Sequence, residues 1–433
     1  MAAALVRSRR RLAEAGDRYC HGIGRCRPPR GVQTEQAGAI AEGMLMTRAL
    51  LNSALAGMGT TIFAEMSALA VETGSVNLGQ GFPDTDGPAE IAKIAAEAVL
   101  AGRGNQYPPG PGVPELRNAV SAHQKRFYGL EVDPETEVLV TAGATEAIAA
   151  AMLALLEPGD EVIAFEPYYD SYAACIAMAG GVRVPVTLRP PAFRPDLDRL
   201  RDAITSRTRL ILLNSPHNPT GMVASRDELA VIASLAVEHD LLVVTDEVYE
   251  HLVFDGQHVP IATLPGMRER TVTISSAGKT FSFTGWKIGW VTGTPELVTA
   301  VRTAKQFLTF VSGGPFQFAI AAGLALPDVF YTDLTANLHR KRDLLADGLQ
   351  AAGFEVFVPQ GTYFISTDIA ALGEADGLAF CRSLPHRCGV VAVPNAVFYD
   401  DQSAGRSLVR FAFCKRDEVL KDAATRLLTL SPR

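Results

Sequence analysis

The chain has 433 residues, of which 48% are hydrophobic and 20% are charged, and its formal net charge is −7 at pH 7. This is the composition of a globular protein with enough apolar residues for more than one core, and its acidic balance argues against nucleic acid as a partner. No apolar run of about 18 residues or more is present, so we expect no membrane partner and a cytoplasmic location. The six cysteines form no Cys-x-x-Cys pair and predict reduced thiols.

Residues 1–46 differ from the rest of the chain. Residues 1–33 contain eight arginines and only two acidic residues. Such a start can be an organelle transit peptide. We favour instead a disordered tail or a start codon assigned too early, because the bias toward Ala, Arg and Gly is typical of a bacterial sequence, and Met44 and Met46 are both available as later starts. We expect no functional residue in this extension.

Residues 86–326 alternate short apolar segments with helical patterns, for example the helices expected over 145–156 and 226–239. The apolar segments are rich in Val, Ile and Leu, and most of them do not alternate with polar residues. They are therefore predicted to be strands buried on both faces of a mostly parallel sheet wrapped by helices, an α/β fold. The predicted strands are 137–141, 161–165, 183–186, 209–213, 241–245, 271–275 and 289–292.

The pattern changes near residue 327, where a smaller α+β domain is predicted. Its expected helices are 329–352 and 417–428, and its expected strands are 355–358, 362–368, 389–394 and 408–413. We therefore expect three regions after the extension. They are an N-terminal segment over 47–90 that packs with the small domain, a large domain over 91–326 and the small domain over 327–433.

Ligands in open α/β sheets bind beyond the carboxyl ends of the strands, and polar sequences follow several of the predicted strands. The sequence Ala-Gly-Ala-Thr-Glu at 142–146 opens a helix and suits an anion, although it could be only a tight connection. Asp246 ends an apolar strand, where a buried carboxylate needs a cation. The alternative for Asp246 is a helix N-cap.

Two further strand ends carry unusual sequences. The loop Asn-Ser-Pro-His-Asn-Pro-Thr-Gly at 214–221 is rigid and polar, although these are also the residues of an ordinary turn. The sequence Ser-Ala-Gly-Lys-Thr-Phe at 276–281 places one lysine behind small residues, and Gly-Trp-Lys-Ile-Gly-Trp at 285–290 places a second lysine eight positions later. Such lysines are unusual for a surface loop and indicate a ligand site.

In order and spacing, the sequences at 214–221, 276–281 and 285–290, together with Asp-Glu-Val-Tyr at 246–249, resemble the class I and II aminotransferases of fold type I, which use pyridoxal 5′-phosphate (PLP). The resemblance covers residues 62–428. It implies a PLP fold type I protein whose large domain holds a seven-stranded, mostly parallel sheet. It also implies a transaminase that works by a ping-pong mechanism, with 2-oxoglutarate as the expected amino acceptor.

The resemblance implies roles for individual residues. Lys279 would bind PLP as a Schiff base and shuttle a proton, and Asp246 would keep the pyridine nitrogen protonated. Asn218 and Tyr249 would donate hydrogen bonds to the phenolic oxygen of PLP. The stacking aromatic and the phosphate-binding residues would be Tyr169, Gly143, Ala144, Thr145, Ser276 and Lys287. Many relatives carry arginine at the position of Lys287, and lysine keeps the charge without the bidentate contact.

Other matched residues concern the substrate and a second subunit. Arg410 interrupts an apolar strand and, in the family pattern, binds the substrate carboxylate, whereas the alternative is a structural salt bridge. Gly81 and Asn218 would line the same substrate site. Tyr107 matches a tyrosine that the neighbouring subunit contributes to the phosphate, which implies a homodimer with shared active sites.

Within the family, Phe-Ala-Glu-Met-Ser at 63–67, Leu-Gly-Gln-Gly-Phe-Pro at 78–83 and Ser-Ala-Gly-Lys-Thr-Phe at 276–281 resemble most the kynurenine-aminotransferase-like branch. Among the members of that branch, residues 143–150 and 217–220 are similar to the actinobacterial N-succinyldiaminopimelate aminotransferases. The implied donor is N-succinyl-LL-2,6-diaminopimelate or a bulky or aromatic amino acid such as kynurenine. The segment between Phe398 and Arg410 is shorter than in that group, which leaves the side-chain specificity open. Two alternatives remain: a cysteine-S-conjugate β-lyase with the same lysine, and a PLP-sensing transcription regulator, for which the N-terminal residues show no helix-turn-helix pattern.

Overall fold

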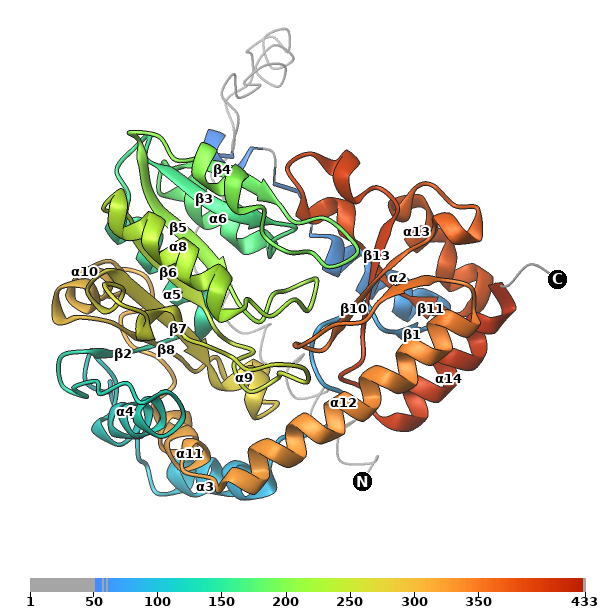
Figure 1. The fold of residues 1–433 in the computed structure, drawn as a ribbon. Helices are drawn as coiled ribbons and strands as arrows, with labels where there is room; N and C mark the ends of the chain where they lie inside the picture. Colours follow the sequence, from blue (N-terminus) through green and yellow to red (C-terminus); the bar gives the residue numbers. More distant parts are fainter. Residues whose placement is uncertain (1–50, 57, 60, 431–433) are drawn as a thin grey trace, which may run out of the picture. The chain divides into compact units, whose positions relative to one another are not determined.

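A computed structural model of the chain describes residues 51–56, 58–59 and 61–430. The extension over residues 1–46, including Cys20 and Cys26, lies outside the described residues. The four cysteines that the structure describes are all free thiols. Figure 1 shows the fold coloured along the chain.

The largest element is the predicted seven-stranded sheet (Figure 1). Its strands follow the order β2-β8-β7-β6-β5-β3-β4, and only β8 runs antiparallel to its neighbours. The strands are β2 (Val138–Thr141), β3 (Glu161–Glu166), β4 (Val182–Thr187), β5 (Thr208–Asn214), β6 (Leu242–Asp246), β7 (Thr271–Ser276) and β8 (Gly289–Thr292). The predicted fold class and mostly parallel sheet are confirmed, with boundaries within two residues of those expected.

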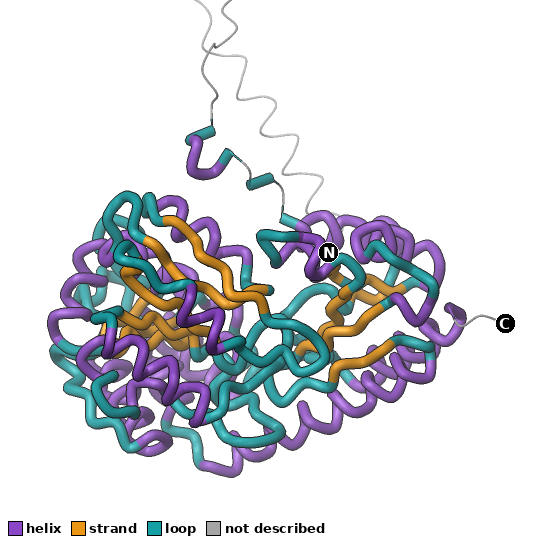
Figure 2. The backbone as a smooth tube through the Cα atoms, turned by 45° about the horizontal axis from the view of Figure 1, so that its top comes forward, coloured by secondary structure: helices purple, strands orange, loops and turns teal. Residues whose placement is uncertain are grey.

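Helices cover both faces of this sheet (Figure 2). On β3, Ile163 and Phe165 pack against the side of α8 (Arg226–Glu238), whereas Val162 and Ala164 pack against the side of α5 (Gly143–Leu155). Successive residues of a strand point to opposite faces, so a strand covered on both sides needs an uninterrupted apolar run. The helices that complete the layers are α6 (Asp170–Met178), α7 (Leu197–Asp202) and α10 (Pro295–Lys305).

The β4 strand is the exception to this burial. The sequence predicts a strand over 183–186 buried on both faces, but Pro185 is exposed, and Arg183 and Val184 are only half-buried. The strand lies at the edge of the sheet and pairs only with β3. Its apolar residues therefore reflect β propensity at an edge rather than complete burial.

Beyond β2 and β8, at the other end of the sheet, three helices form a further layer. They are α3 (Ala89–Leu100), α4 (Pro114–Tyr128) and α11 (Gly314–Leu324). Ile91, Leu116 and Ile320 of these helices share one apolar cluster with Val140 and Trp290 of the strands. This layer supports the strand ends from which the predicted lysine motifs emerge.

The C-terminal part contains an antiparallel four-stranded sheet in the order β12-β13-β10-β9. Its strands are β9 (Glu355–Phe357), β10 (Phe364–Asp368), β12 (Val393–Pro394) and β13 (Leu408–Ala412). The strand predicted over 389–394 is in fact two strands. Val390–Val391 forms β11 and pairs with β1 (Val76–Asn77), and after Ala392 the chain joins β13 in the other sheet.

The helices packed on these small sheets are α2 (Ile62–Thr73), α12 (Asp328–Ala351), α13 (Gly377–Cys388) and α14 (Asp417–Leu427). Met66 and Leu78, from the N-terminal segment, belong to the same buried cluster as Leu345 and Phe364. The division of the chain into an N-terminal segment, a large domain and a small domain stays a prediction.

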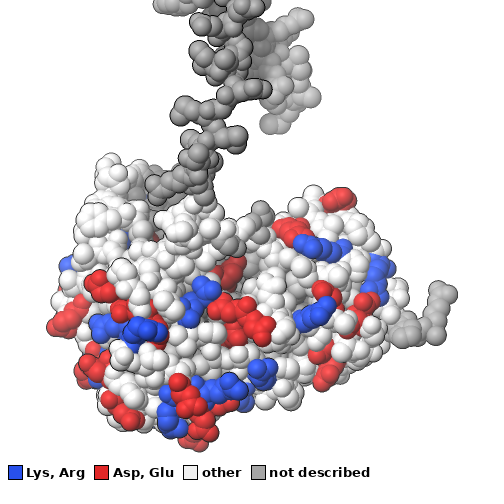
Figure 3. Space-filling model, turned by 90° about the horizontal axis from the view of Figure 1, so that it is seen from above, with Lys and Arg blue, Asp and Glu red and all other residues white. Residues whose placement is uncertain are grey.

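The surface carries both signs of charge. On the face in Figure 3, acidic and basic side chains are interspersed rather than gathered in one large area of a single sign. Among the helices in the described ranges, none combines the length and the apolar character needed to cross a membrane.

Candidate active site

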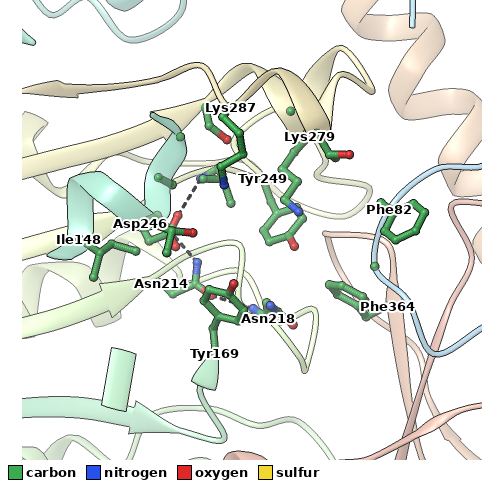
Figure 4. A pocket seen from close by; sticks show the side chains of 18 of the residues that line it. Phe82, Ile148, Tyr169, Asn214, Asn218, Asp246, Tyr249, Lys279, Lys287 and Phe364 are labelled. Carbon is green, nitrogen blue, oxygen red and sulfur yellow. Dashed lines mark hydrogen bonds between the residues drawn. The ribbon is translucent and has the colours of Figure 1, made fainter. Parts of the chain in front are cut away.

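All of the predicted site residues except Tyr107 line one cavity of about 330 Å³ (Figure 4). The size lies in the range of small-molecule sites. The cavity begins at the carboxyl ends of the parallel strands, where the sequence motifs follow the sheet. The residues brought together are Gly81, Gly143, Ala144, Thr145, Tyr169, Asn218, Asp246, Tyr249, Ser276, Lys279, Lys287 and Arg410.

Lys279 lies in α9 (Ala277–Thr280), the short helix that follows β7, and its side chain points into the cavity (Figure 4). The Nζ atom is 5.8 Å from the ring centroids of Tyr249 and of Tyr363. Burial lowers the pKa of Lys279, and the charges of Lys287 and Arg410 lower it further. A lowered pKa increases the share of neutral amine, which is the nucleophilic form.

Asp246 is buried at the end of β6. Its Oδ2 accepts a hydrogen bond from the hydroxyl of Tyr172 at 2.7 Å, and its Oδ1 accepts one from the backbone N–H of Val248 at 3.2 Å. One oxygen therefore caps the following turn, and the other is held by a side chain. Burial raises the pKa of this carboxyl. No Lys, Arg or His of the described ranges makes a salt bridge with it, so a cationic ligand atom would complete the site.

An anion site is formed where β2 leads into α5. Gly143 has φ 79°, and a Cβ added there would lie 3.2 Å from Nζ of Lys287. A Cβ on Gly289 would lie 2.7 Å from the carbonyl carbon of Gly143, so the strand β8 needs glycine to lie against this turn. The lysine ammonium and the N-terminus of a 13-residue helix thus face the same space. This donor set fits a phosphate group.

Arg410 extends from the middle of β13 and is only 2% exposed. Its Nη1 donates to Oδ1 of Asn218 at 3.0 Å, its Nη2 donates to the carbonyl of Gly79 at 3.1 Å, and its Nε has no partner. Three aromatic rings surround the guanidinium: Phe63, Phe364 and Phe398.

The alternative role of Arg410, a structural salt bridge, is not found within the described part of the chain. Burial lowers the pKa of Arg410 to about 10, so the group remains charged at neutral pH. A buried guanidinium without a carboxylate partner is costly, and its fork matches a carboxylate. The cavity is therefore suited to a ligand that carries a carboxylate.

Gly81 and Tyr107 differ in placement. A Cβ on Gly81 would lie 2.4 Å from the ring of Phe364, and its carbonyl accepts a hydrogen bond from the hydroxyl of Tyr363 at 2.6 Å. The backbone can approach the cavity this closely only because the residue is glycine. Tyr107 does not line the cavity. It is 80% exposed, with its ring 5.4 Å from that of Phe310.

Sequence reasoning missed several residues of the cavity. Asn214 donates to the carbonyl of Asp246 at 2.8 Å and accepts from the N–H of Asn218 at 2.8 Å, and it is the first residue of the polar loop over 214–221. Tyr172 lies three residues after the predicted Tyr169. Phe63 lies in a motif of the kynurenine-aminotransferase-like branch, but that motif indicated no role for its side chain. Phe364 carried no signal, because one aromatic residue in an apolar sequence is indistinguishable from core.

Comparison with protein families identifies the class. Residues 73–427 match the family described as aminotransferase class I and II. The chain therefore belongs to the class I and II aminotransferases, a family that uses PLP, and it is a transaminase. This confirms the predicted family and enzyme class, and it favours the enzyme over the PLP-sensing regulator.

Two individual proteins and one solved structure are similar to most of the chain. The chain is 54% identical over 385 residues to the Mycobacterium tuberculosis protein named "Probable N-succinyldiaminopimelate aminotransferase DapC", which covers 86% of this chain and 97% of that protein. It is 41% identical over 379 residues to the methionine aminotransferase of Escherichia coli, covering 87% and 98%. The solved structure of the M. tuberculosis N-succinyldiaminopimelate aminotransferase matches with a TM-score of 0.86 at 53% identity, covering 88% of this chain and 100% of that one.

Proposed function

We propose that this aminotransferase binds PLP in the cavity and transfers an amino group from N-succinyl-LL-2,6-diaminopimelate to 2-oxoglutarate. The observation that carries the proposal is the presence, in one cavity, of a lysine with a lowered pKa and a buried arginine without a carboxylate partner. The choice of donor rests on the name of the mycobacterial relative. When bound, PLP supplies an electron sink for the charge that develops on the substrate α-carbon.

The residues present fit this cofactor. The carboxylate of Asp246 supplies the anion that a protonated pyridine nitrogen requires, and Tyr249 and Asn218 supply donors for the phenolic oxygen. Tyr169 offers an aromatic face. The phosphate would be held by the backbone and side chains at the start of α5 and by the two residues that face it, namely Gly143, Ala144, Thr145, Ser276 and Lys287.

Proton transfer and orientation of the substrate are carried out by the protein's own side chains. Lys279 is the base for the substrate α-proton and returns a proton as an acid, and its lowered pKa increases the share of the neutral amine that can act as the base. Arg410 fixes the α-carboxylate, which orients the α-C–H bond relative to the lysine. Because one guanidinium serves both donor and acceptor, the two must bind in turn, and a ping-pong mechanism follows.

A second donor class is supported by the lining of the cavity. Phe63, Phe82 and Phe364 face the same space as Arg410, and Phe82 is 44% exposed. Such an aromatic lining also suits a bulky apolar side chain. The relatives named methionine aminotransferase and kynurenine–oxoglutarate transaminase are consistent with this class.

We also propose that the enzyme is a homodimer in which Tyr107 completes the neighbour's phosphate site. The support is an exposed aromatic pair, since Tyr107 is 80% and Phe310 is 51% exposed and their ring centroids are 5.4 Å apart. Exposed aromatic patches of this kind mark interfaces. Sedimentation should give a dimer, and mixing Tyr107→Ala with Lys279→Ala should restore some activity if sites are shared. A monomer that is fully active would contradict the proposal.

Assay of the purified enzyme with a panel of donors tests the function. The panel contains N-succinyl-LL-2,6-diaminopimelate, methionine, kynurenine and aspartate, each with 2-oxoglutarate, and glutamate formation is measured. We expect the highest kcat/KM for the succinylated donor and parallel double-reciprocal lines. Turnover confined to aspartate, or intersecting lines, would contradict the proposal. Release of pyruvate and ammonia from a cysteine conjugate without a 2-oxo acid would indicate the β-lyase instead.

A further inference from the structure

A buried group of metal-ligating side chains lies just beyond the candidate active site in the sequence. Glu250 and His251 directly follow Tyr249, and His123 comes from α4. The Nε2 atoms of His123 and His251 are 2.7 Å apart, and the ligand atoms of the three residues all lie within 4.8 Å of one another. None of the three side chains has a role in the proposed transamination.

The charge of Glu250 lacks a basic partner. The side chain is 5% exposed and accepts hydrogen bonds from the hydroxyls of Tyr128 and Ser275, each at 2.5 Å. No salt bridge from the described basic residues reaches it. The nearby Glu247, in contrast, has His258 at 2.9 Å. A buried carboxylate is normally paired with a cation or bound to a metal, so the space between Glu250 and the two imidazoles is short of one positive charge.

We propose that His123, Glu250 and His251 bind one Zn²⁺ ion. Two imidazole nitrogens and one carboxylate oxygen form a known ligand set for this ion, with a further position left for water. At Zn–N distances of about 2.0–2.1 Å in tetrahedral geometry, the two nitrogens would separate to roughly 3.3 Å. This requires a movement of about half an ångström from the present spacing. His251 is only half-buried, so the site has one side nearer the surface.

The position of the proposed zinc site indicates that a bound ion would stabilise the fold beside the candidate active site. Glu250 is adjacent to Tyr249, and its partner Ser275 is adjacent to Ser276, so the carboxylate already links the ends of β6 and β7. A bound ion would add α4 to this link through His123. We expect it to stabilise the strand ends that carry the candidate active site without contacting the substrate.

The test measures metal binding rather than activity. The full-length enzyme as purified is treated with EDTA, dialysed and titrated with ZnCl₂ by calorimetry. We expect one ion per chain and a rise in the thermal midpoint. His123→Gln and Glu250→Gln should each weaken binding by more than about tenfold, since even residues behind the ligands contribute this much. His386→Gln, at an exposed histidine on α13, is the matched control and should bind as the wild type does.

The competing explanation is a hydrogen bond between two neutral imidazoles. In that case the wild type would bind no Zn²⁺, or would bind it as weakly as the two variants, and the proposal would be wrong. Circular dichroism shows whether the variants fold. Should they not, CoCl₂ added to the wild type decides the question, because a tetrahedral site gives intense visible bands and an absent site gives the spectrum of the aqueous ion.

Discussion

The two large sheets contribute to the cavity in different ways. The seven-stranded sheet supplies residues from the turns that follow its strands, such as Lys279, Asp246 and the glycine turn at Gly143. The four-stranded sheet supplies Arg410 from the middle of β13, with strands paired on both sides of it. The first group is polar and numerous, whereas the second is a single cation surrounded by aromatic rings.

This difference indicates how the contacts with cofactor and substrate are divided between the two sheets. On the side of the seven-stranded sheet, several residues share the contacts with the proposed cofactor, so the loss of one hydrogen bond should have a small effect. On the side of the four-stranded sheet, one guanidinium makes the contact with the substrate carboxylate. Loss of that guanidinium should therefore weaken substrate binding strongly and leave PLP binding unchanged. Lys279 differs from both groups, because it takes part in the reaction itself rather than sharing a binding contact.

The largest effect is expected for Lys279→Ala. Both the nucleophilic amine and the proton carrier disappear, and acid–base catalysis alone is worth up to about 10⁴-fold. We expect no measurable transamination, while PLP still binds without a covalent bond because the phosphate-binding residues remain. Lys421→Ala, at an exposed lysine of α14, is the control and should be fully active. Substantial activity of Lys279→Ala would contradict the assigned role.

Arg410→Ala should have the next largest effect. Truncation of one partner of a buried charge pair costs about 2–5 kcal/mol, which corresponds to roughly 30- to several-thousand-fold in kcat/KM. The PLP absorbance should not change, since the guanidinium faces the substrate in this account. Steady-state kinetics and spectra of the variant are compared with those of Arg199→Ala, where the side chain is 77% exposed. Loss of PLP from Arg410→Ala would show that the residue has another role.

Tyr172→Phe should have a modest effect on the cofactor side. It removes the hydrogen bond to Asp246, worth about 0.5–1.5 kcal/mol, so PLP should bind roughly 2- to 10-fold more weakly. That hydrogen bond lowers the pKa of the Asp246 carboxyl against the effect of burial, and its loss should therefore raise the pKa. The acid limb of the pH–activity profile should move to higher pH. An unchanged profile would mean that Asp246 is not the titrating group.

The smallest effect is expected for deletion of residues 1–43. The composition changes after this segment, and no motif of the family lies in it. Solubility, thermal midpoint and kcat/KM of the truncated enzyme should equal those of the full chain. An insoluble or inactive truncated enzyme would show that the extension supports the fold.

Much of the sheet and of the site was predictable from the sequence, for a physical reason. Strands covered on both faces need unbroken apolar runs, and the polar residues that directly follow such runs, like Asp246, are costly to bury without a partner. Arg410 was predictable in the same way, as a charge within an apolar strand. The catalytic roles themselves came from the family resemblance.

Other features depend on tertiary contacts that local sequence does not encode. The valines of β4 predict a buried strand, but the strand also contains Arg183 and Pro185, and it lies at the sheet edge, where it pairs only with β3. The break at Ala392 arises because β11 and β12 find partners in different sheets. Phe63 and Phe364 gain their positions from the packing around Arg410. An aromatic residue becomes part of a site only when the fold places it there.

The most direct test of the central claim is to identify the lysine that binds PLP. The native enzyme is reduced with borohydride and digested, and the peptide that carries the pyridoxyl group is found by mass spectrometry. Lys279 and Lys287 both face the cavity, so the measurement separates a covalent role from a phosphate-binding one. We expect loss of the visible absorbance and a pyridoxyl group on Lys279. A pyridoxyl group on Lys287, or on no lysine, would contradict it.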